Sequence, residues 1–172
     1  AAATSHMLSL AAMEEASRVG QRTADIDHLL LALVMNEQRA GHVLRGLGIT
    51  LDSARDAVVE QHSDQLASLG IEMPAPVPGR IVFHETGGYD WSERAHDIIK
   101  RANEGRKSGD AAAVLRELVT EPSGLIAAVL TRLGTTPDTV VTRLDETEPP
   151  NTHPTGRVVS SGRLSGTSEA FA

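Results

Sequence analysis

An internal repeat is the feature of this 172-residue sequence that most restricts its possible folds. Short segments of the first half return in the second half after 85 or 86 residues. The matching segments are Leu33-Val34 with Leu118-Val119, Leu47-Gly48 with Leu133-Gly134, and Asp52 with Asp138. A constant offset at three places is hard to obtain by chance. The chain is therefore expected to hold two similar units packed as a pseudo-dimer.

Apolar periodicity predicts that both units are helical. Aliphatic residues recur at three- and four-residue spacing, and the apolar run 29–34 is typical of a central buried helix. The expected helices cover residues 1–19, a segment that begins near Asp25 or Asp27, 39–47, 51–68 with Asp52 as a plausible cap, and a segment from the N-cap Ser92 to about residue 104. The pattern also places Val19, Leu66 and Leu69 inward, whereas Glu14 and Glu15 are expected on a solvated face.

Composition divides the chain into four parts. Residues 1–70 form the first repeat and residues 91–145 the second. The linker 71–90 between them is rich in glycine and proline, which break regular elements. Residues 146–172 are dominated by Glu, Pro, Thr, Ser and Gly and are expected to form a flexible tail. The predicted fold class is all-α, with about eight helices in two pseudo-symmetric four-helix repeats joined by the linker.

The overall composition excludes several classes of function. The chain has no cysteine, so disulfide scaffolds and Cys-ligated metal sites are excluded. Its net charge of −7 and its 2% aromatic content argue against nucleic-acid binding. No apolar run reaches the length of a membrane span and no signal peptide is visible, which favours a cytoplasmic protein. None of the seven histidines forms an HxxxH, HxH or HExxH pair, so neither a metal nor a cofactor is expected.

Three of the four aromatic residues lie close together at the end of the linker. They are Phe83, Tyr89 and Trp91. Aromatic side chains beside a loop are typical anchors of protein interfaces, so these residues are candidates for partner binding. The alternative is that they fasten the linker to the helices, with Trp91 packing in front of the Ser92 cap.

The repeats resemble the Clp amino-terminal repeat. The first copy carries Ala12-Met13-Glu14-Glu15-Ala16, then Asp27-His28 before the run 29–34, then Leu47-Gly48-Ile49. The second copy begins at Trp91-Ser92 and continues through Leu118-Val119 to Leu133-Gly134. The resemblance covers roughly residues 4–145, which is most of the chain. It implies the all-α domain of eight helices that stands in front of the ATPase rings of Clp-type AAA+ unfoldases.

This resemblance implies a protein-interaction module and not an enzyme. Such a domain receives substrate or adaptor proteins for a Clp unfoldase and the ClpP protease. The chain contains no Gly-x-x-x-x-Gly-Lys-Ser/Thr sequence, so it carries no ATPase site of its own. It is expected to be a monomer in isolation. The alternatives are a free-standing decoy or adaptor that sequesters ligands of the unfoldase, and a purely structural oligomerisation domain.

Within the resemblance, Asp27 and His28 mark a possible ligand site. In related domains a Thr-Glu-His triplet of each repeat contributes to a phosphoarginine pocket, where the acid receives the guanidinium group. Here the first triplet reads Ile26-Asp27-His28 and the second reads Ala111-Ala112-Ala113. A two-site phosphoarginine reader is therefore not expected, and one weakened site at Asp27 is the remaining possibility. The simpler interpretation makes Asp27 a helix cap and His28 a packed or capping histidine.

Overall fold

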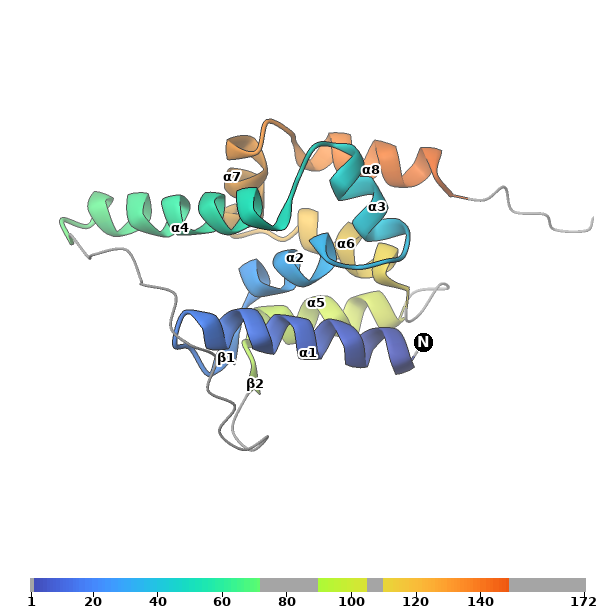
Figure 1. Ribbon diagram of the computed structural model, residues 1–172, viewed down its shortest axis with the longest axis horizontal. Helices are drawn as coiled ribbons and strands as arrows, with labels where there is room; N and C mark the ends of the chain where they lie inside the picture. The colour runs from blue at the N-terminus through green and yellow to red at the C-terminus, as the bar shows by residue number, and fades with distance from the viewer. Residues whose placement is uncertain (1, 72–89, 105–109, 149–172) are drawn as a thin grey trace, which may run out of the picture.

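The structure, a computed structural model, describes residues 2–71, 90–104 and 110–148. Within these residues it contains eight helices and two short strands, which confirms the predicted all-α fold (Figure 1). In chain order the elements are α1 (Ala2–Arg18), β1 (Thr23–Ala24), α2 (Ile26–Val34), α3 (Arg39–Gly46), α4 (Leu51–Ser68), β2 (Asp90–Trp91), α5 (Glu93–Glu104), α6 (Ala111–Val119), α7 (Leu125–Arg132) and α8 (Pro137–Glu146). Most of the predicted linker and tail lie outside the described residues.

Helix α2 is the centre of the molecule. All nine of its residues are buried, and the apolar run 29–34 predicts this for six of them. A helix without a polar face needs cover on every side. Helix α2 obtains that cover from α1, α3, α4, α6 and α7, which surround it (Figure 1).

The repeat that is visible in the sequence is also visible in the backbone. Helices α2 and α6 are both nine residues long, and α3 and α7 are both eight. The helices α3 and α7 end before Gly48 and Gly134, which have φ angles of 83° and 79°. Glycine adopts this left-handed conformation at little cost, so it reverses the chain after the same helix in both repeats.

The structure selects one of the two expected starts of α2 and corrects the expected cap of α4. The N-cap of α2 is Asp25, while Asp27 lies inside the first turn. The N-cap of α4 is Thr50, and not Asp52, because the Thr50 and Ser53 side chains each accept a hydrogen bond from the other's backbone amide. A hydroxyl immediately before the helix can reach the free amide of the third helical residue, whereas Asp52, the second residue of α4, already lies past the cap position.

The buried apolar residues of both repeats form one continuous cluster rather than two separate bundle cores. Three residues that the apolar pattern places inward are less buried than expected. Val19 follows the end of α1 and is exposed, Leu69 at the end of α4 is 74% exposed, and Leu66 is only half-buried. The last turns of α4 extend past the neighbouring helices (Figure 1), so their apolar residues have little to pack against.

Glu15, in contrast, is more buried than the sequence pattern predicts. The sequence pattern places it on a solvated face, yet it is only 4% exposed. Its carboxylate receives two hydrogen bonds from Arg55 of α4, from Nε at 3.0 Å and from Nη2 at 2.6 Å. This bidentate pair compensates the burial of the charge and joins α1 to α4.

A short parallel strand pair, which the sequence did not predict, joins the start of the second repeat to the first. Thr23 of β1 pairs with Asp90 of β2, and Ala24 pairs with Trp91. The ladder continues for one bond, as the Ser92 amide donates to the Ala24 carbonyl at 2.8 Å. The pair therefore brings the N-terminus of α5 beside the N-terminus of α2.

Candidate functional site

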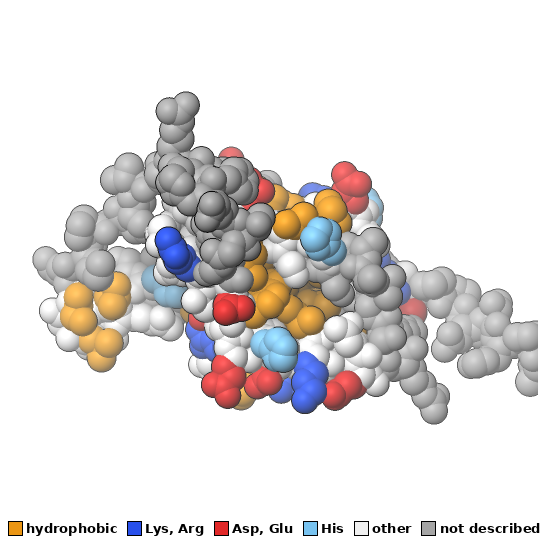
Figure 2. Space-filling view, turned by 90° about the horizontal axis from the view of Figure 1, so that it is seen from below, with side chains coloured by type: hydrophobic (Ala, Val, Ile, Leu, Met, Phe, Trp, Pro, Cys, Tyr) orange, Lys and Arg blue, Asp and Glu red, His pale blue; other side chains and the backbone are white. Residues whose placement is uncertain are grey.

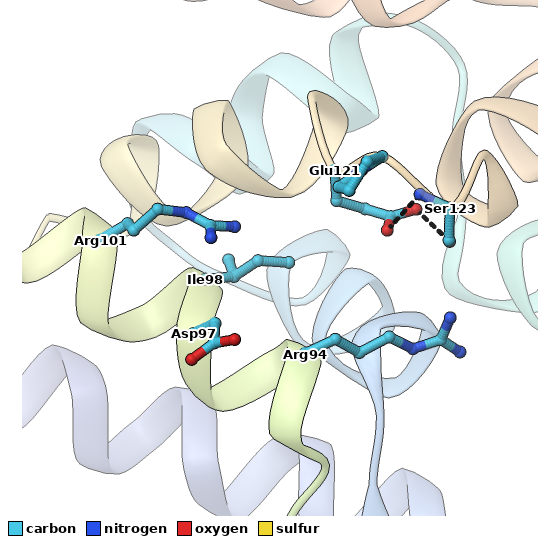
Figure 3. A pocket seen from close by; sticks show the side chains of 7 residues that line it. Arg94, Asp97, Ile98, Arg101, Glu121 and Ser123 are labelled. Carbon is cyan, nitrogen blue, oxygen red and sulfur yellow. Dashed lines mark hydrogen bonds between the residues drawn. The ribbon is translucent and has the colours of Figure 1, made fainter.

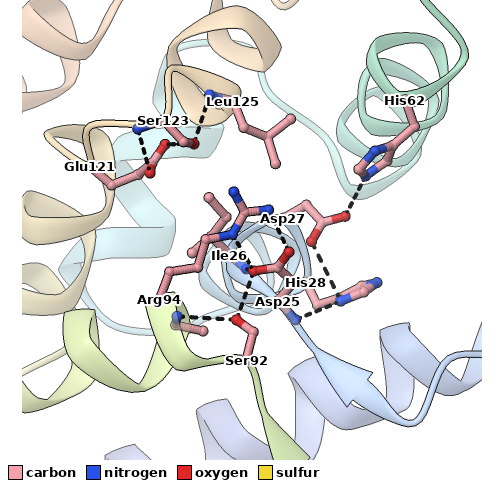
Figure 4. Close-up of polar contacts among 11 residues, drawn as sticks. Asp25, Ile26, Asp27, His28, His62, Ser92, Arg94, Glu121, Ser123 and Leu125 are labelled. Atoms are coloured by element: carbon pink, nitrogen blue, oxygen red, sulfur yellow. Dashed lines mark hydrogen bonds and ion pairs between the residues drawn. The ribbon is translucent and has the colours of Figure 1, made fainter. Parts of the chain in front are cut away.

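Polar side chains of helices α2, α4 and α5, and of the residues that immediately precede α2 and α5, converge at the N-terminus of α2 (Figure 4). We call this group the α2 polar cluster; it consists of Asp25, Asp27, His28, His62, Ser92 and Arg94. The strand pair supplies Ser92 and Arg94 from the second repeat, and α4 supplies His62. The cluster therefore lies where the two repeats meet.

Asp25 is the hub of this cluster. Its carboxylate accepts hydrogen bonds from Ser92 Oγ at 2.7 Å and from Arg94 Nε and Nη2 at 2.7 and 2.5 Å. Burial alone raises the pKa of Asp25, but the hydrogen bonds from Arg94 and Ser92 outweigh it and lower the pKa to about 2. The same carboxylate caps α2 through the Ile26 amide at 2.8 Å. Every one of these contacts stabilises the charged form of Asp25.

Asp27 lies deeper, with only 3% of its surface exposed. Its Oδ2 accepts a hydrogen bond from His62 Nε2 at 2.8 Å. Its Oδ1 is buried and accepts no hydrogen bond from the described residues. Burial is the largest effect and raises the pKa of Asp27, but the hydrogen bond from His62 and the electrostatic interactions with the two neighbouring histidines together outweigh it and leave the pKa below its ordinary value. A buried carboxylate with one unused oxygen depends strongly on its single donor.

His28 completes the cap of α2. Its Nδ1 accepts a hydrogen bond from the Asp25 amide at 3.0 Å, which requires that Nδ1 carry no proton. The 3.5 Å contact between this Nδ1 and Asp27 Oδ1 therefore joins two acceptors and is not an ion pair. The prediction of a packed or capping histidine is confirmed, because His28 is both buried and part of a capping box.

The second repeat keeps the cap of this site and loses the rest. Asp110 is the N-cap of α6 and accepts a hydrogen bond from the Ala112 amide at 3.0 Å. Ala112 and Ala113 occupy the positions that correspond to Asp27 and His28. Neither alanine can accept a proton or bind a cation, so the second repeat has no counterpart of the Asp27 and His28 side chains.

A shallow pocket of about 330 Å³ lies beside the cluster, between α5 and the loop that joins α6 to α7 (Figure 3). Ile98 forms its apolar floor, and Arg94 and Arg101 flank it. Three of its charged side chains have partners. Arg94 contacts Asp25, Arg101 contacts Glu117, and Glu121 accepts hydrogen bonds from the amide and hydroxyl of Ser123. Two arginines and two acids give the pocket a rim of balanced charge, and within it the Ser123 hydroxyl donates to Glu121 at 2.5 Å.

The structure brings together some of the residues that the sequence singled out. Asp27 and His28 lie in the α2 polar cluster, and Trp91 lies in β2, where it is half-buried and packs against the core. Phe83 and Tyr89 lie outside the described residues. Sequence reasoning missed His62, which lies 35 residues from Asp27, and Arg94, which lies 69 residues from Asp25. Only the cap of α2 had a local signal, the Asp25–His28 spacing of a capping box.

The described part of the chain contains neither a group of metal ligands nor a helix that could span a membrane. No three of its His, Asp or Glu residues are placed so that they could hold a metal ion. Among the helices of residues 2–71, 90–104 and 110–148, none combines the length and the apolar character that crossing a bilayer demands.

Solved structures share this fold. One of them is the N-terminal domain of the caseinolytic protease associated chaperone ClpD from Arabidopsis thaliana, which is 21% identical in sequence and superposes with a TM-score of 0.61. The match covers 83% of this chain and 90% of that domain. No protein-family profile matches the sequence, and a search of the curated proteins finds no significant relative. The likeness therefore rests on three-dimensional structure and shows the fold.

Proposed function

We propose that this chain, which has the fold of a Clp N-terminal domain, is a non-catalytic module that binds substrate or adaptor proteins of a Clp unfoldase and protease system. The observation that carries the proposal is the fold itself, shared with a chaperone domain over 83% of the chain. The resemblance of both repeats to the Clp amino-terminal pattern supports it independently, because that resemblance lies in the sequence alone.

The chemistry of the α2 polar cluster supports a binding role over a catalytic one. Ser92 is the hydroxyl in the cluster, and it donates to Asp25, whose pKa is about 2. A general base works best when its pKa lies near the operating pH, so Asp25 is a poor base for activating Ser92. His28 uses Nδ1 for the helix cap, and His62 contacts Asp27 rather than a nucleophile. These groups hold elements together.

Within this proposal the aromatic residues Phe83, Tyr89 and Trp91 contact the partner protein. Trp91 is half-buried in β2 and would act as the fixed end of that surface. Asp27 and His28 are the second candidate contact, for proteins that carry phosphoarginine. Because Asp27 is buried and hydrogen-bonded to His62, a guanidinium group reaches it only by displacing that imidazole.

A binding titration with a defined unfolded protein tests the proposal. Fluorescein-labelled casein is titrated with the full chain and followed by fluorescence anisotropy. We expect saturable binding with a Kd in the micromolar range, and at least a tenfold weaker Kd for the double variant Phe83→Ala/Tyr89→Ala. The matched control is Phe171→Ala, which removes the remaining aromatic residue of the chain and should leave the affinity unchanged.

Two results would contradict the proposal in different ways. An anisotropy that stays flat up to the highest attainable protein concentration would argue against binding of unfolded substrate. The affinity could also be equal in the wild type, the double variant and the Phe171 control. That result would support the binding function but show that Phe83 and Tyr89 do not contact the partner.

A further inference from the structure

We propose that the contact between His62 and Asp27 is a pH-sensitive latch, which holds the distal part of α4, from residue 61 onward, against α2 and loosens when the imidazole loses its proton. The proposal rests on how α4 is attached to the rest of the molecule. It stands independently of the proposed binding function.

The two parts of α4 are attached by different forces. In the first part Ala54, Ala57 and Val58 are buried in the core. Residues 63–68 include no buried side chain, and Leu66 is the only one of them that is even half-buried. Apolar side chains gather at the free end of this helix (Figure 2), where Leu69 is 74% and Ile71 45% exposed. Burial of apolar side chains therefore holds the first part of α4 in place. The second part is held by very little burial and needs other contacts.

Polar contacts at two points hold the distal part. His62 donates to Asp27 of α2 at 2.8 Å. Arg132 of α7 contacts the other side of α4, through Gln61 Oε1 at 2.9 Å and through the carboxylate of Asp64. If both contacts were lost, the last turns of α4 would keep little beyond their own helical hydrogen bonds. An isolated helical end frays readily.

Of these two points, only the His62 contact changes its charge near neutral pH. The arginine stays protonated and the exposed carboxylates stay ionised throughout this range, so the Arg132 contact is constant. Histidine is the residue that titrates between pH 5 and 8. The hydrogen bond with Asp27 raises the pKa of His62, although burial partly opposes the effect.

The groups that face His62 come from several elements. From the α2 side they are Asp27 and Asp25, which both favour the charged imidazole, and His28, whose Nδ1 is already used as an acceptor. From α5 comes Arg94, which disfavours the charge but is paired with Asp25. The nearest charged side chains on α4, Glu60 and Asp64, both contact Arg132 of α7. Farther along α4, Arg55 is paired with Glu15 of α1.

The direction of the pH effect follows from these shifts. A histidine whose pKa is raised by folding contributes stability below its unfolded pKa of about 6.5 and loses it as the pH rises through the folded pKa. An aspartate whose pKa is lowered contributes stability above about 3.8 and loses it as the pH falls through the folded pKa. The latch is therefore tightest between about pH 4 and 6.5. Above that window a neutral imidazole still donates a hydrogen bond, but one roughly half as strong.

The experiment compares amide exchange along α4 at different pH values. Hydrogen exchange of residues 63–69, corrected for intrinsic rates, is measured by NMR between pH 5.5 and 8.5. Titration of the His62 ring protons is followed in the same samples. We expect the corrected exchange rate to rise about tenfold for each unit by which Asp27 raises the pKa of His62. Helix α8, in which no histidine occurs, serves as the internal control.

Two variants make the test decisive. In His62→Gln the amide still donates to Asp27 but cannot titrate, so the pH dependence of residues 63–69 should disappear. In Asp27→Asn the pKa of His62 should fall towards its ordinary value. His62 is 42% exposed, so the glutamine variant tests the latch even if burying an uncharged amide in place of the Asp27 carboxylate prevents folding. The proposal is overturned if the distal amides exchange equally at both pH extremes, or if the dependence persists in His62→Gln.

Discussion

Helices α2 and α6 follow the same plan and are used differently. Both are nine residues long, and each begins after an aspartate N-cap, Asp25 or Asp110. All nine residues of α2 are buried, whereas α6 keeps Ala113, Arg116 and Glu117 partly exposed. The repeat thus fixes the backbone of each helix, while position in the molecule decides how much of it is covered.

The N-caps of α2 and α6 also differ, in how tightly each aspartate is bound to an arginine. Each N-cap aspartate lies near an arginine of the other repeat, so the two repeats are joined by two related contacts. Asp25 receives Arg94 in a bidentate pair at 2.5 and 2.7 Å, but Asp110 and Arg39 are 3.7 Å apart. In addition, α4 has 18 residues and carries His62 to Asp27, whereas its counterpart α8 has 10. The stronger polar contacts therefore lie at the N-terminus of α2, where the second repeat contributes Arg94 and α4 contributes His62.

The largest expected effect comes from equivalent core truncations in the two helices. Leu30 of α2 and Leu115 of α6 are both fully buried. Truncation of a buried leucine to alanine costs the lost burial and leaves a cavity, about 2–5 kcal/mol in total. We expect Leu30→Ala near the upper end and Leu115→Ala near the lower end, because α2 is enclosed on all sides. Urea denaturation followed by circular dichroism measures both.

Equal losses in the two variants would break the comparison, because they would show that α6 is as central as α2. A matched control is Leu69→Ala at the exposed end of α4, which should change the free energy of unfolding by less than about 0.5 kcal/mol.

The sequence predicted the apolar part of the structure well and the polar part poorly. The periodic positions of α2 and the glycine after α3 are local signals, and each one specifies its element without reference to the rest of the chain. The contacts of Asp27 with His62 and of Glu15 with Arg55 join residues 35 and 40 apart. Nothing near these residues in the sequence indicates such contacts, because only the packing of α4 against α1 and α2 creates them.

The exposed end of α4 shows where apolar periodicity predicts too much burial. Leu66 and Leu69 continue the apolar pattern of the helix, so periodicity predicted that they point inward. Periodicity identifies the face of a helix but not whether another element reaches that face. Here the neighbouring helices end before the last turns of α4 (Figure 1), and Leu69 remains exposed.

The second prediction compares the two caps. Asp110→Ala removes a cap and a weak ion pair and should cost about 1 kcal/mol. Asp25→Ala removes a cap and also leaves Ser92 and Arg94 without their acceptor, and we expect about 2 kcal/mol. Urea denaturation at pH 7 measures both free energies of unfolding.

The pH dependence of the Asp25 variant sharpens this result. The folded pKa of Asp25 is about 2, below its ordinary value of 3.8. Its contribution is therefore complete above about pH 4 and is lost as the pH falls towards 2. The stability difference between the wild type and Asp25→Ala should shrink between pH 5 and pH 2. A constant difference over that range would mean that the cap, and not the charge of Asp25, carries the effect.

The smallest expected effect is one in which the two repeats should agree. Gly48 and Gly134 have nearly the same positive φ, and a Cβ added at either position meets no atom within 4 Å. Alanine at these positions destabilises the folded state only through its left-handed backbone, by about 1–2 kcal/mol. The lower entropy of its unfolded chain partly offsets this cost. We expect Gly48→Ala and Gly134→Ala to lose about 0.5–1 kcal/mol each and to differ by less than the error of denaturation experiments. A clear difference between them would show that the repeats diverge in their backbone, and not only in the side chains that α2 and α4 bring together.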